Sequence, residues 1–154
     1  MAFDLENILE QFEARAVHKA MQQGSSQILD GLSAYDVDIC DLATLHRATG
    51  HEYALFGRIR ESVEERILIR GEPYRVHIPS CFLDEDVIWY AHSHPNDDTV
   101  ASPQDHSALQ SFRRVNGQQR SVIVTIDGSC RDFSAHRDLA NEINSIFGIN
   151  TPGN

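Results

Sequence analysis

The sequence contains few cysteines and no long apolar run. Its 154 residues include three cysteines, Cys40, Cys81 and Cys130, which are odd in number and show no CxxC spacing. We therefore expect a reducing compartment, with the cysteines serving as small buried hydrophobic residues. No apolar run approaches the length of a membrane span, and residues 1–6 lack the basic and apolar segments of a secretory signal. A cytoplasmic protein without a membrane partner is expected.

Positive charge is also scarce. Thirteen lysines and arginines stand against 23 aspartates and glutamates, which gives a formal net charge of -10. A general nucleic-acid binder needs a cationic surface to neutralise phosphates, so no nucleic-acid partner is expected. An acidic balance is typical of a solvated surface and by itself names no partner.

The apolar pattern divides the chain into an N-terminal extension and one main domain. Residues 4–22 carry a helical apolar stripe with Asp4 as N-cap, which predicts a helical extension over residues 1–24. This helix is a candidate docking element for a partner or a second copy. A weakly patterned connection, residues 27–35, leads to a domain over residues 35–150, and this length suits one domain with its own core.

The main domain is predicted to be α+β, with a mixed curved sheet flanked by helices. The expected elements, in order, are a strand at 37–39, a helix capped by Asp41 and closed by Gly50, paired strands at 52–59 and 66–69 around a polar turn at 61–65, strands at 74–78 and 87–91, a helix at 102–115, a strand at 121–126, a hairpin turn at 127–128, a strand at 130–136 and a helix at 138–147.

Two histidines lie one residue apart where the buried strand at 87–91 ends. In an extended segment residues i and i+2 point to the same side, so His92 and His94 can converge on one ion while Ser93 faces away. Pro95 then stops the strand. Taken alone, a His-x-His pair is a weak indication of metal binding.

The segment Ser102-Pro103-Gln104-Asp105 has two interpretations. It is a good helix N-terminus without any metal, with serine at N-cap, proline at N1 and an acidic residue at N3. It also brings a carboxylate to the start of a helix that follows the strand ending in His92 and His94. Two imidazoles and one carboxylate suit zinc, whose catalytic sites keep a fourth position for water. The two halves together favour a metal site.

The spacing of these residues resembles the signature of the JAMM (JAB/MPN+) metalloproteases, in a prokaryotic-type single-domain form. The match runs His92-x-His94-Pro95, then residues 96–101, then Ser102-x-x-Asp105, and the similarity covers roughly residues 35–137. In that family the two histidines and the aspartate bind zinc, and the serine helps to stabilise the tetrahedral intermediate. The resemblance implies an MPN/JAB-like, cytidine-deaminase-like architecture with three layers.

The family also has an upstream glutamate that acts on the zinc-bound water, and the resemblance assigns this role to Glu52. Glu52 opens the expected strand at 52–59, where a carboxylate outside the ligand set could reach that water. The alternative is a solvent-facing strand start. Gly57 arrives about two residues earlier than in the family pattern. The glutamates of the polar turn at 61–65 are poorer candidates.

The other histidines and the strand aromatics receive lesser roles. His106 and His51 are expected beside the site, as neighbours of Asp105 and Glu52. The remaining histidines are expected to be ordinary surface or core residues: His18, His46, His77 and His136. Trp89 and Tyr90 most simply pack in the sheet.

The resemblance implies a zinc-dependent isopeptidase or peptidase. Its substrate would be an amide bond that follows the C-terminal tail of ubiquitin or a ubiquitin-like protein, or another peptide or amide. Two alternatives are a non-catalytic MPN-type scaffold and a RadC-like DNA-associated domain. The complete ligand set disfavours the first, and the acidic charge together with Glu52 disfavours the second.

Overall fold

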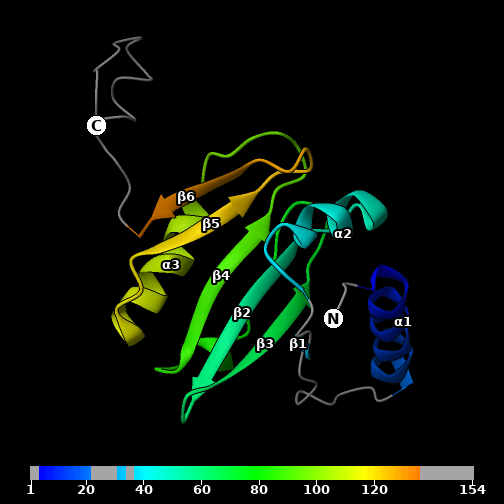
Figure 1. The fold of residues 1–154 in the computed structure, drawn as a ribbon, viewed down its shortest axis with the longest axis horizontal. Helices are drawn as coiled ribbons and strands as arrows, with labels where there is room; N and C mark the ends of the chain where they lie inside the picture. The colour runs from blue at the N-terminus through cyan, green and yellow to red at the C-terminus, as the bar shows by residue number, and fades with distance from the viewer. Residues whose placement is uncertain (1–3, 22–30, 34–36, 136–154) are drawn as a thin grey trace.

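The computed structural model describes residues 4–21, 31–33 and 37–135, and the fold is that of these residues (Figure 1). The elements are α1 (Leu5–Met21), β1 (Gly31–Ser33), α2 (Asp41–Thr49), β2 (Tyr53–Arg60), β3 (Val63–Arg70), a short 3-10 helix η1 (Ser80–Phe82), β4 (Val87–Ser93), α3 (Pro103–Asn116), β5 (Arg120–Val124) and β6 (Cys130–Ser134). The expected closing helix at 138–147 lies outside the described residues, as does the end of the N-terminal extension. No helix in the described part of the chain is long and apolar enough to cross a membrane.

The six strands form one mixed sheet in the order β1-β3-β2-β4-β5-β6. β4 and β5 are parallel, and every other neighbouring pair is antiparallel. The connection between the parallel strands is α3, as expected for a crossover that must return to the same end of the sheet. The predicted α+β class with a mixed sheet is confirmed.

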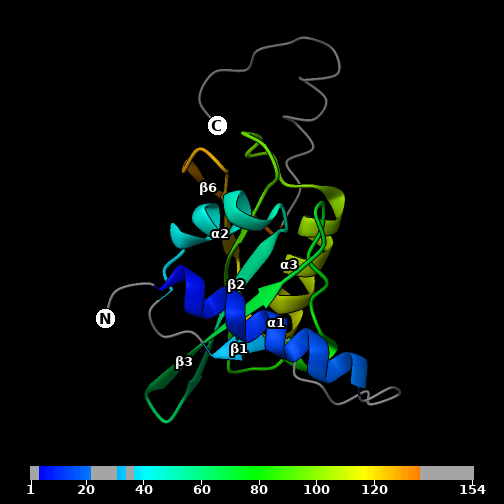
Figure 2. The same cartoon turned by 90° about the vertical axis from the view of Figure 1, so that its right-hand side faces the viewer.

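Helices cover both faces of the sheet (Figures 1 and 2). One face packs against α1 and α2 through buried residues Ile8, Phe12, Leu42, Leu45, Tyr53, Leu55, Leu68, Ala91 and Val124. The other face packs against α3 through buried residues Ala54, Phe56, Ile67, Ile69, Trp89, Leu109, Phe112, Ile123 and Phe133. Alternate residues of β2 serve the two cores, as the pleat of a strand buried on both faces requires.

The N-terminal helix is part of the core. Its predicted cap is confirmed, because the Asp4 carboxylate accepts the backbone N–H of Asn7 at 3.1 Å. Phe12 is buried edge-on against Tyr53, and the Arg70 guanidinium lies over its ring at 5.3 Å from the centroid. The sheet therefore covers the apolar side of α1, and a docking role for this helix stays a prediction.

Turn chemistry explains why β3 is longer than predicted, whereas β2 has the predicted length and lies one residue later. Glu61 and Ser62 both have positive φ, 50° and 66°, which is the backbone of a tight two-residue hairpin turn. The polar turn expected over 61–65 is therefore shorter, and its later residues belong to β3. Gly50 ends α2 with φ 74°, as predicted, but Asp41 is the first helical residue and not its cap. Its carboxylate instead accepts the N–H of Asp38 at 2.8 Å.

Two predicted strands are wrong. Residues 37–39 enter α2 through a turn, and Val37 is buried by packing under that helix without joining a ladder. The strand lies earlier, at β1, inside the segment expected to be a simple connection. Residues 74–78 form no strand in the described structure, because Val76 and Ile78 turn towards α3 and line a cavity beside the sheet.

The cysteine prediction is also wrong, since Cys40, Cys81 and Cys130 are all exposed free thiols. Each lies at an element boundary, in the turn before α2, in η1 and at the start of β6 respectively. Cys40 and Cys81 lie outside the sheet, and Cys130 is the first residue of β6, an edge strand, so core side chains cover none of the three. Their apolar character alone therefore did not determine whether they are buried.

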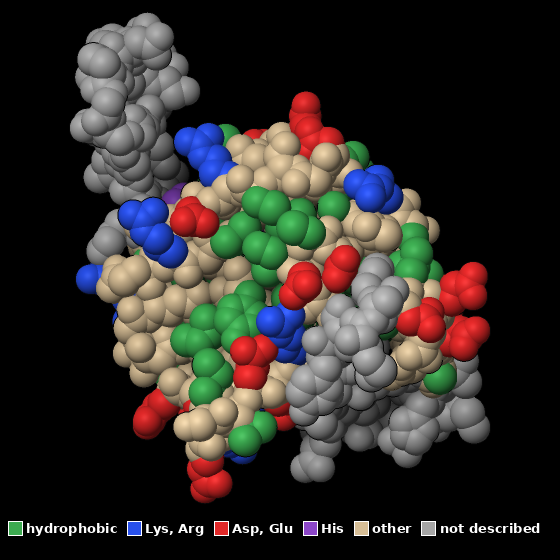
Figure 3. Space-filling model, in the orientation of Figure 1, with side chains coloured by type: hydrophobic (Ala, Val, Ile, Leu, Met, Phe, Trp, Pro, Cys, Tyr) green, Lys and Arg blue, Asp and Glu red, His purple; other side chains and the backbone are tan. Residues whose placement is uncertain are grey.

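Charged side chains of both signs are mixed on the surface. On the face drawn in Figure 3, the described Arg side chains are interspersed with acidic ones. This face offers no continuous basic footprint of the kind that phosphate neutralisation requires. The absence of a nucleic-acid partner stays a prediction.

Candidate metal centre

A β-bulge in β4 decides which side chains reach the site. Leu55 and Phe56 are consecutive in β2 and pair with Ala91 and Trp89 of β4. Tyr90 is therefore an extra residue in β4. Trp89 and His92 consequently share one face of the sheet, with ring centroids 5.0 Å apart. A regular strand would have put them on opposite faces. The bulge thus aims both at the cavity beside α3.

His92 and His94 converge as predicted. Their Nε2 atoms lie 3.1 Å apart, and both rings are buried. The backbone N–H of His94 donates to Val124 O at 2.9 Å, which keeps this residue aligned with β5 beyond the last residue of β4. Ser93 points to the other side of the strand, also as predicted, and is fully buried beside α2.

Asp105 completes the cluster from the first turn of α3. Its Oδ1 lies 3.1 Å from His92 Nε2, and its Oδ2 lies 3.2 Å from His94 Nε2. The predicted capping box is present as well: Ser102 N–H donates to Asp105 Oδ2 at 2.9 Å, and Asp105 N–H donates to Ser102 Oγ at 3.1 Å. The structural and the metal-binding interpretations of this segment therefore hold together, because Oδ2 accepts the capping N–H and faces His94 while Oδ1 faces His92.

The three side chains can hold one metal ion. One ligand atom from each of His92, His94 and Asp105 lies within 4.8 Å of the others. A tetrahedral zinc site with bonds near 2.0–2.1 Å has ligand atoms about 3.3 Å apart. The observed separations of 3.1 to 3.2 Å are close to this value, so the ring nitrogens and the carboxylate need only small movements to bind. The geometry by itself does not choose among metals that accept nitrogen and oxygen ligands.

Comparison of the chain with family models, with curated proteins and with solved structures finds no match. What the protein does must therefore be inferred from the chemistry of the site itself.

The loop after β4 fixes the tautomer of His94. Nδ1 of His94 lies 2.8 Å from Asp98 O, and because a carbonyl only accepts, Nδ1 carries the proton. A neutral His94 then presents the lone pair of Nε2 to the cluster. This is the arrangement in which a second hydrogen bond orients a metal-binding imidazole. The loop holds this carbonyl in place through Asn96, whose side chain accepts Asp98 N–H at 2.9 Å.

Charges in the cluster are strongly coupled. Burial alone raises the pKa of Asp105, but hydrogen bonds with His92 and His94 outweigh burial and hold this pKa well below its usual range. Burial lowers the pKa of His92. Burial also lowers the pKa of His94, but its bonds to Asp105 and to the Asp98 carbonyl prevail and the net pKa is raised. An ionised carboxylate beside a neutral His92 is the protonation state that a metal ligand set requires.

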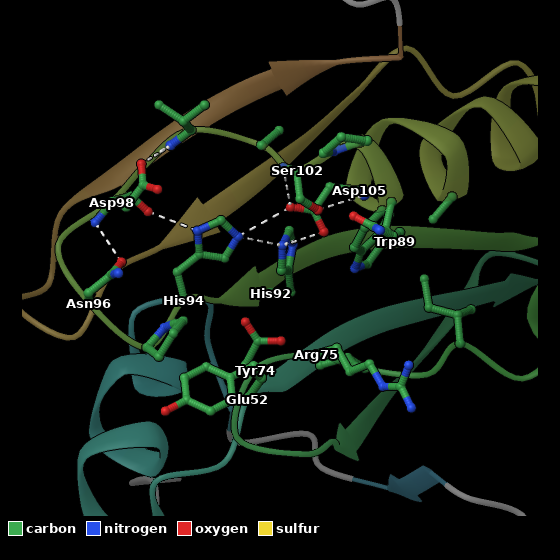
Figure 4. Close-up of a pocket in the computed structure, with 18 residues that line it drawn as sticks. Glu52, Tyr74, Arg75, Trp89, His92, His94, Asn96, Asp98, Ser102 and Asp105 are labelled. Atoms are coloured by element: carbon green, nitrogen blue, oxygen red, sulfur yellow. Dashed lines mark hydrogen bonds and ion pairs between the residues drawn. The ribbon is translucent and has the colours of Figure 1, made fainter.

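Glu52 faces this cluster from the opposite side to Asp105 (Figure 4). It is only 4% exposed and lines the same cavity as the two histidines. Backbone bonds fix it on both sides, since Glu52 N–H donates to Glu72 O at 2.9 Å and Gly71 N–H donates to Glu52 O at 2.7 Å. Burial raises the pKa of Glu52 to about 8. A buried carboxyl with this pKa is suited to exchange protons near neutral pH.

The metal cavity, as we call the space around these residues, has a volume of about 630 Å³. Ser102, Trp89 and Glu52 line its inner part, and the exposed side chains of Tyr74 and Val100 stand at its rim. An apolar channel of about 240 Å³ adjoins it and shares three lining residues with it: Val76, Ile78 and Ala108. The cavity can therefore accept a substrate that continues along an apolar path beside α3.

Sequence reasoning missed His46, which was expected to be an ordinary residue. His46 is buried, and its Nδ1 lies 2.8 Å from Ser93 Oγ. The same Ser93 hydroxyl accepts the backbone N–H of Tyr53 at 2.9 Å, so it ties the end of β4 to the start of β2, next to Glu52. Burial lowers the pKa of His46. Only the buried position of Ser93, between two site histidines, could have indicated this contact.

His106 and His51 do not join the ligand cluster. His106 Nδ1 lies 2.9 Å from Ser134 O, which ties α3 to the end of β6. His51 Nδ1 lies 2.8 Å from Gly71 O and so holds the segment that follows β3. Both are neighbours of site residues in the chain and serve its framework. His106 therefore offers a control for substitutions of the metal ligands.

Proposed function

We propose that this protein is a zinc-dependent hydrolase of the JAMM type, with an MPN-like architecture. His92, His94 and Asp105 would hold the ion. Glu52 would act as general base and then general acid, and Ser102 would stabilise the oxyanion. A zinc isopeptidase or peptidase is the reaction class that uses all five groups.

One observation carries the proposal: a buried glutamate outside the ligand set shares the metal cavity with the His-His-Asp cluster. A structural zinc site is closed by four protein ligands, whereas a catalytic site has three and an open position. Here three ligands converge, and Glu52 faces them from the side that no ligand occupies (Figure 4). A scaffold protein has no need of this arrangement.

Zinc, when bound, would lower the pKa of water towards about 7 and polarise the substrate carbonyl. Glu52 would accept the proton of the attacking water and deliver it to the leaving amine. Ser102 Oγ accepts Asp105 N–H, so its own proton is free to be donated to the developing oxyanion. The buried floor formed by Trp89 keeps bulk water from one side of these groups.

For the substrate, we propose the extended C-terminal tail of a ubiquitin-like protein joined to an amine. Such a tail is narrow enough to reach a recessed metal and long enough to follow the channel. Val76 and Ile78 belong to a segment without regular secondary structure, outside the sheet, and their side chains line the channel in which such a peptide would lie beside α3.

The test is a cleavage screen of ubiquitin-like fusions and isopeptide conjugates with the zinc-loaded protein. Wild type should cleave a substrate and lose this activity on chelation. Glu52→Gln should bind zinc and lose turnover, because the amide cannot accept the proton. Full activity in Glu52→Gln would remove the base assignment, and activity that survives exhaustive chelation would remove the metal from the mechanism.

A further inference from the structure

A second pocket lies beside the metal cavity and is not used by the proposed mechanism. We call it the side pocket; it has a volume of about 480 Å³ and is lined by His46, Arg47, Gly50 and Ile126, among others. Tyr74 and Pro95 line both the side pocket and the metal cavity. One ligand can therefore extend past these two side chains and occupy both spaces.

The side pocket presents donors. Arg47 uses Nη1 to bind Ile126 O and Nη2 to bind Thr44 Oγ1, which leaves three of its five N–H groups for a ligand. Within the described ranges no carboxylate pairs with Arg47, although the chain has a net charge of -10. The C-terminal end of α2 at Gly50 brings a partial charge of only about -0.5, which is smaller than the full charge of the guanidinium.

His46 adds a neutral donor at the base of the pocket. Ser93 Oγ accepts Tyr53 N–H and lies 2.8 Å from His46 Nδ1. In the tautomer in which the Ser93 hydroxyl donates to Nδ1, the ring proton is on Nε2, the nitrogen for which the described residues supply no partner. An imidazole N–H and a guanidinium in one pocket suit a carboxylate.

The position of the side pocket assigns it to the leaving amine. Glu52, the proposed proton donor to that amine, is two residues from Gly50 at the edge of the side pocket. The apolar channel lies in the other direction, along α3, and suits the acyl part. A leaving amine that receives its proton from Glu52 is therefore directed towards Arg47.

We propose that the side pocket is the subsite for the leaving amine and that it selects amines carrying a carboxylate. The carboxylate can be the free α-carboxylate of the amino acid that is released, or an acidic side chain next to a modified lysine. This inference rests on the proposed hydrolase function, because it names the amine half of the substrate.

The test measures binding of the amine half alone by the 154-residue chain supplied with zinc. Three probes are titrated: acetyl-lysine with a free α-carboxylate, acetyl-lysyl-aspartyl amide with only a side-chain carboxylate, and acetyl-lysine amide with none. The backbone NMR signals of Gly50 and Ile126 report occupancy of the side pocket. At least one carboxylate probe should bind about tenfold or more tightly than the neutral amide, as expected for a charge-assisted pair. The carboxylate probe that binds more tightly shows whether the pocket recognises a free α-carboxylate or an acidic side chain.

Two variants make the test specific. Arg47→Gln should abolish the preference for a carboxylate, whereas Arg75→Gln should keep it. Arg75 is the matched control, since it is an exposed arginine that lines the metal cavity on the other side of Tyr74. In wild type the preference should also shrink between low and high salt. This measurement needs no variant.

The inference is overturned if all three probes bind equally, or if Arg47→Gln keeps the preference. A preference that disappears on chelation and persists in Arg47→Gln would show that the metal binds the carboxylate, which also overturns it. Because the probes are not cleaved, a negative result leaves the hydrolase proposal standing. If the protein held no zinc, the hydrolase proposal would fail, whereas the binding of the probes would still show whether Arg47 recognises a carboxylate.

Discussion

The carboxylate of Asp105 contacts the backbone N–H of Ser102 and the two histidines of the proposed metal site at the same time. Asp105 Oδ2 accepts the backbone N–H of Ser102 at 2.9 Å, while Oδ1 lies 3.1 Å from His92 Nε2. The helix cap thus fixes the orientation in which Oδ1 faces His92 and Oδ2 itself faces His94 at 3.2 Å. Local helix chemistry and the proposed metal chemistry depend on the same group, and substitutions can separate them.

Ser102 separates capping from catalysis. Ser102→Ala should reduce the free energy of unfolding by about 1 kcal/mol, and Ser102→Gly by only a few tenths of that amount, because glycine is a tolerated N-cap. Both variants lose the hydroxyl donor, so both should lower kcat by about 10²–10³-fold. Urea unfolding and cleavage kinetics measure the two effects. If Ser102→Gly kept both its stability and its turnover while Ser102→Ala lost both, the role of Ser102 would be limited to capping α3.

Glu52 should make the metal-free protein less stable as the pH rises. Its pKa is raised from 4.5 to about 8 in the fold, so the folded state holds a proton that the unfolded state loses. Glu52→Gln should match wild type below pH 4.5 and become more stable above it, by roughly 2–4 kcal/mol at pH 8 and beyond. Urea unfolding across this range measures the difference.

Zinc is the control for this effect. A bound cation near Glu52 favours the ionised carboxylate, so the advantage of Glu52→Gln should shrink in the zinc-loaded protein. A difference that did not depend on pH would show that Glu52 is not the buried acid of the site.

Ser93 should matter more to stability than a comparable buried serine. Ser93→Ala leaves Tyr53 N–H and His46 Nδ1 without a partner, and each unpaired buried group costs about 1–3 kcal/mol. Ser121 is the matched control: it donates to Trp89 O, which keeps a second bond from Gln118 at 2.7 Å. Ser121→Ala should cost about 1 kcal/mol. Equal losses in urea unfolding would argue against the tie between β4 and β2.

The N-terminal helix should be needed for stability. Phe12→Ala removes a buried ring that packs on Tyr53 and lies under Arg70, and it should cost about 3–5 kcal/mol. Glu10 is exposed on the same helix, and Glu10→Ala should change stability by less than about 0.5 kcal/mol. Thermal or urea unfolding measures both. If Phe12→Ala unfolded like wild type, α1 would not belong to the core.

The sequence predicted the parts of the site that follow from local rules. The strand at β4 has a continuous apolar run, and the start of α3 has a capping box. These two features led us to expect that His92, His94 and Asp105 converge and that Ser102 caps α3, as they do. These features depend on residues close together in the chain. The same is true of Gly50, whose left-handed backbone ends α2.

What the sequence did not predict depends on long-range pairing. The short strand β1 has only three residues, and it exists because β3 offers a free edge. Conversely, residues 74–78 have a strand-like pattern, yet α3 and the metal cavity take their side chains. The bulge at Tyr90 and the contact between His46 and Ser93 likewise depend on neighbours distant in the chain. No local signal specifies them.

Zinc content per chain tests the central claim most directly. After zinc supplementation and removal of excess metal, wild type should hold about one zinc per chain, and so should His106→Asn. His92→Ala should lose the zinc. Asp105→Asn is the sharpest variant, because an amide oxygen can still accept Ser102 N–H and cap α3, while its NH₂ cannot replace the carboxylate oxygen facing His92. We predict a folded Asp105→Asn protein without zinc. Negligible zinc in wild type, or wild-type zinc content in Asp105→Asn, would contradict the proposed metal centre.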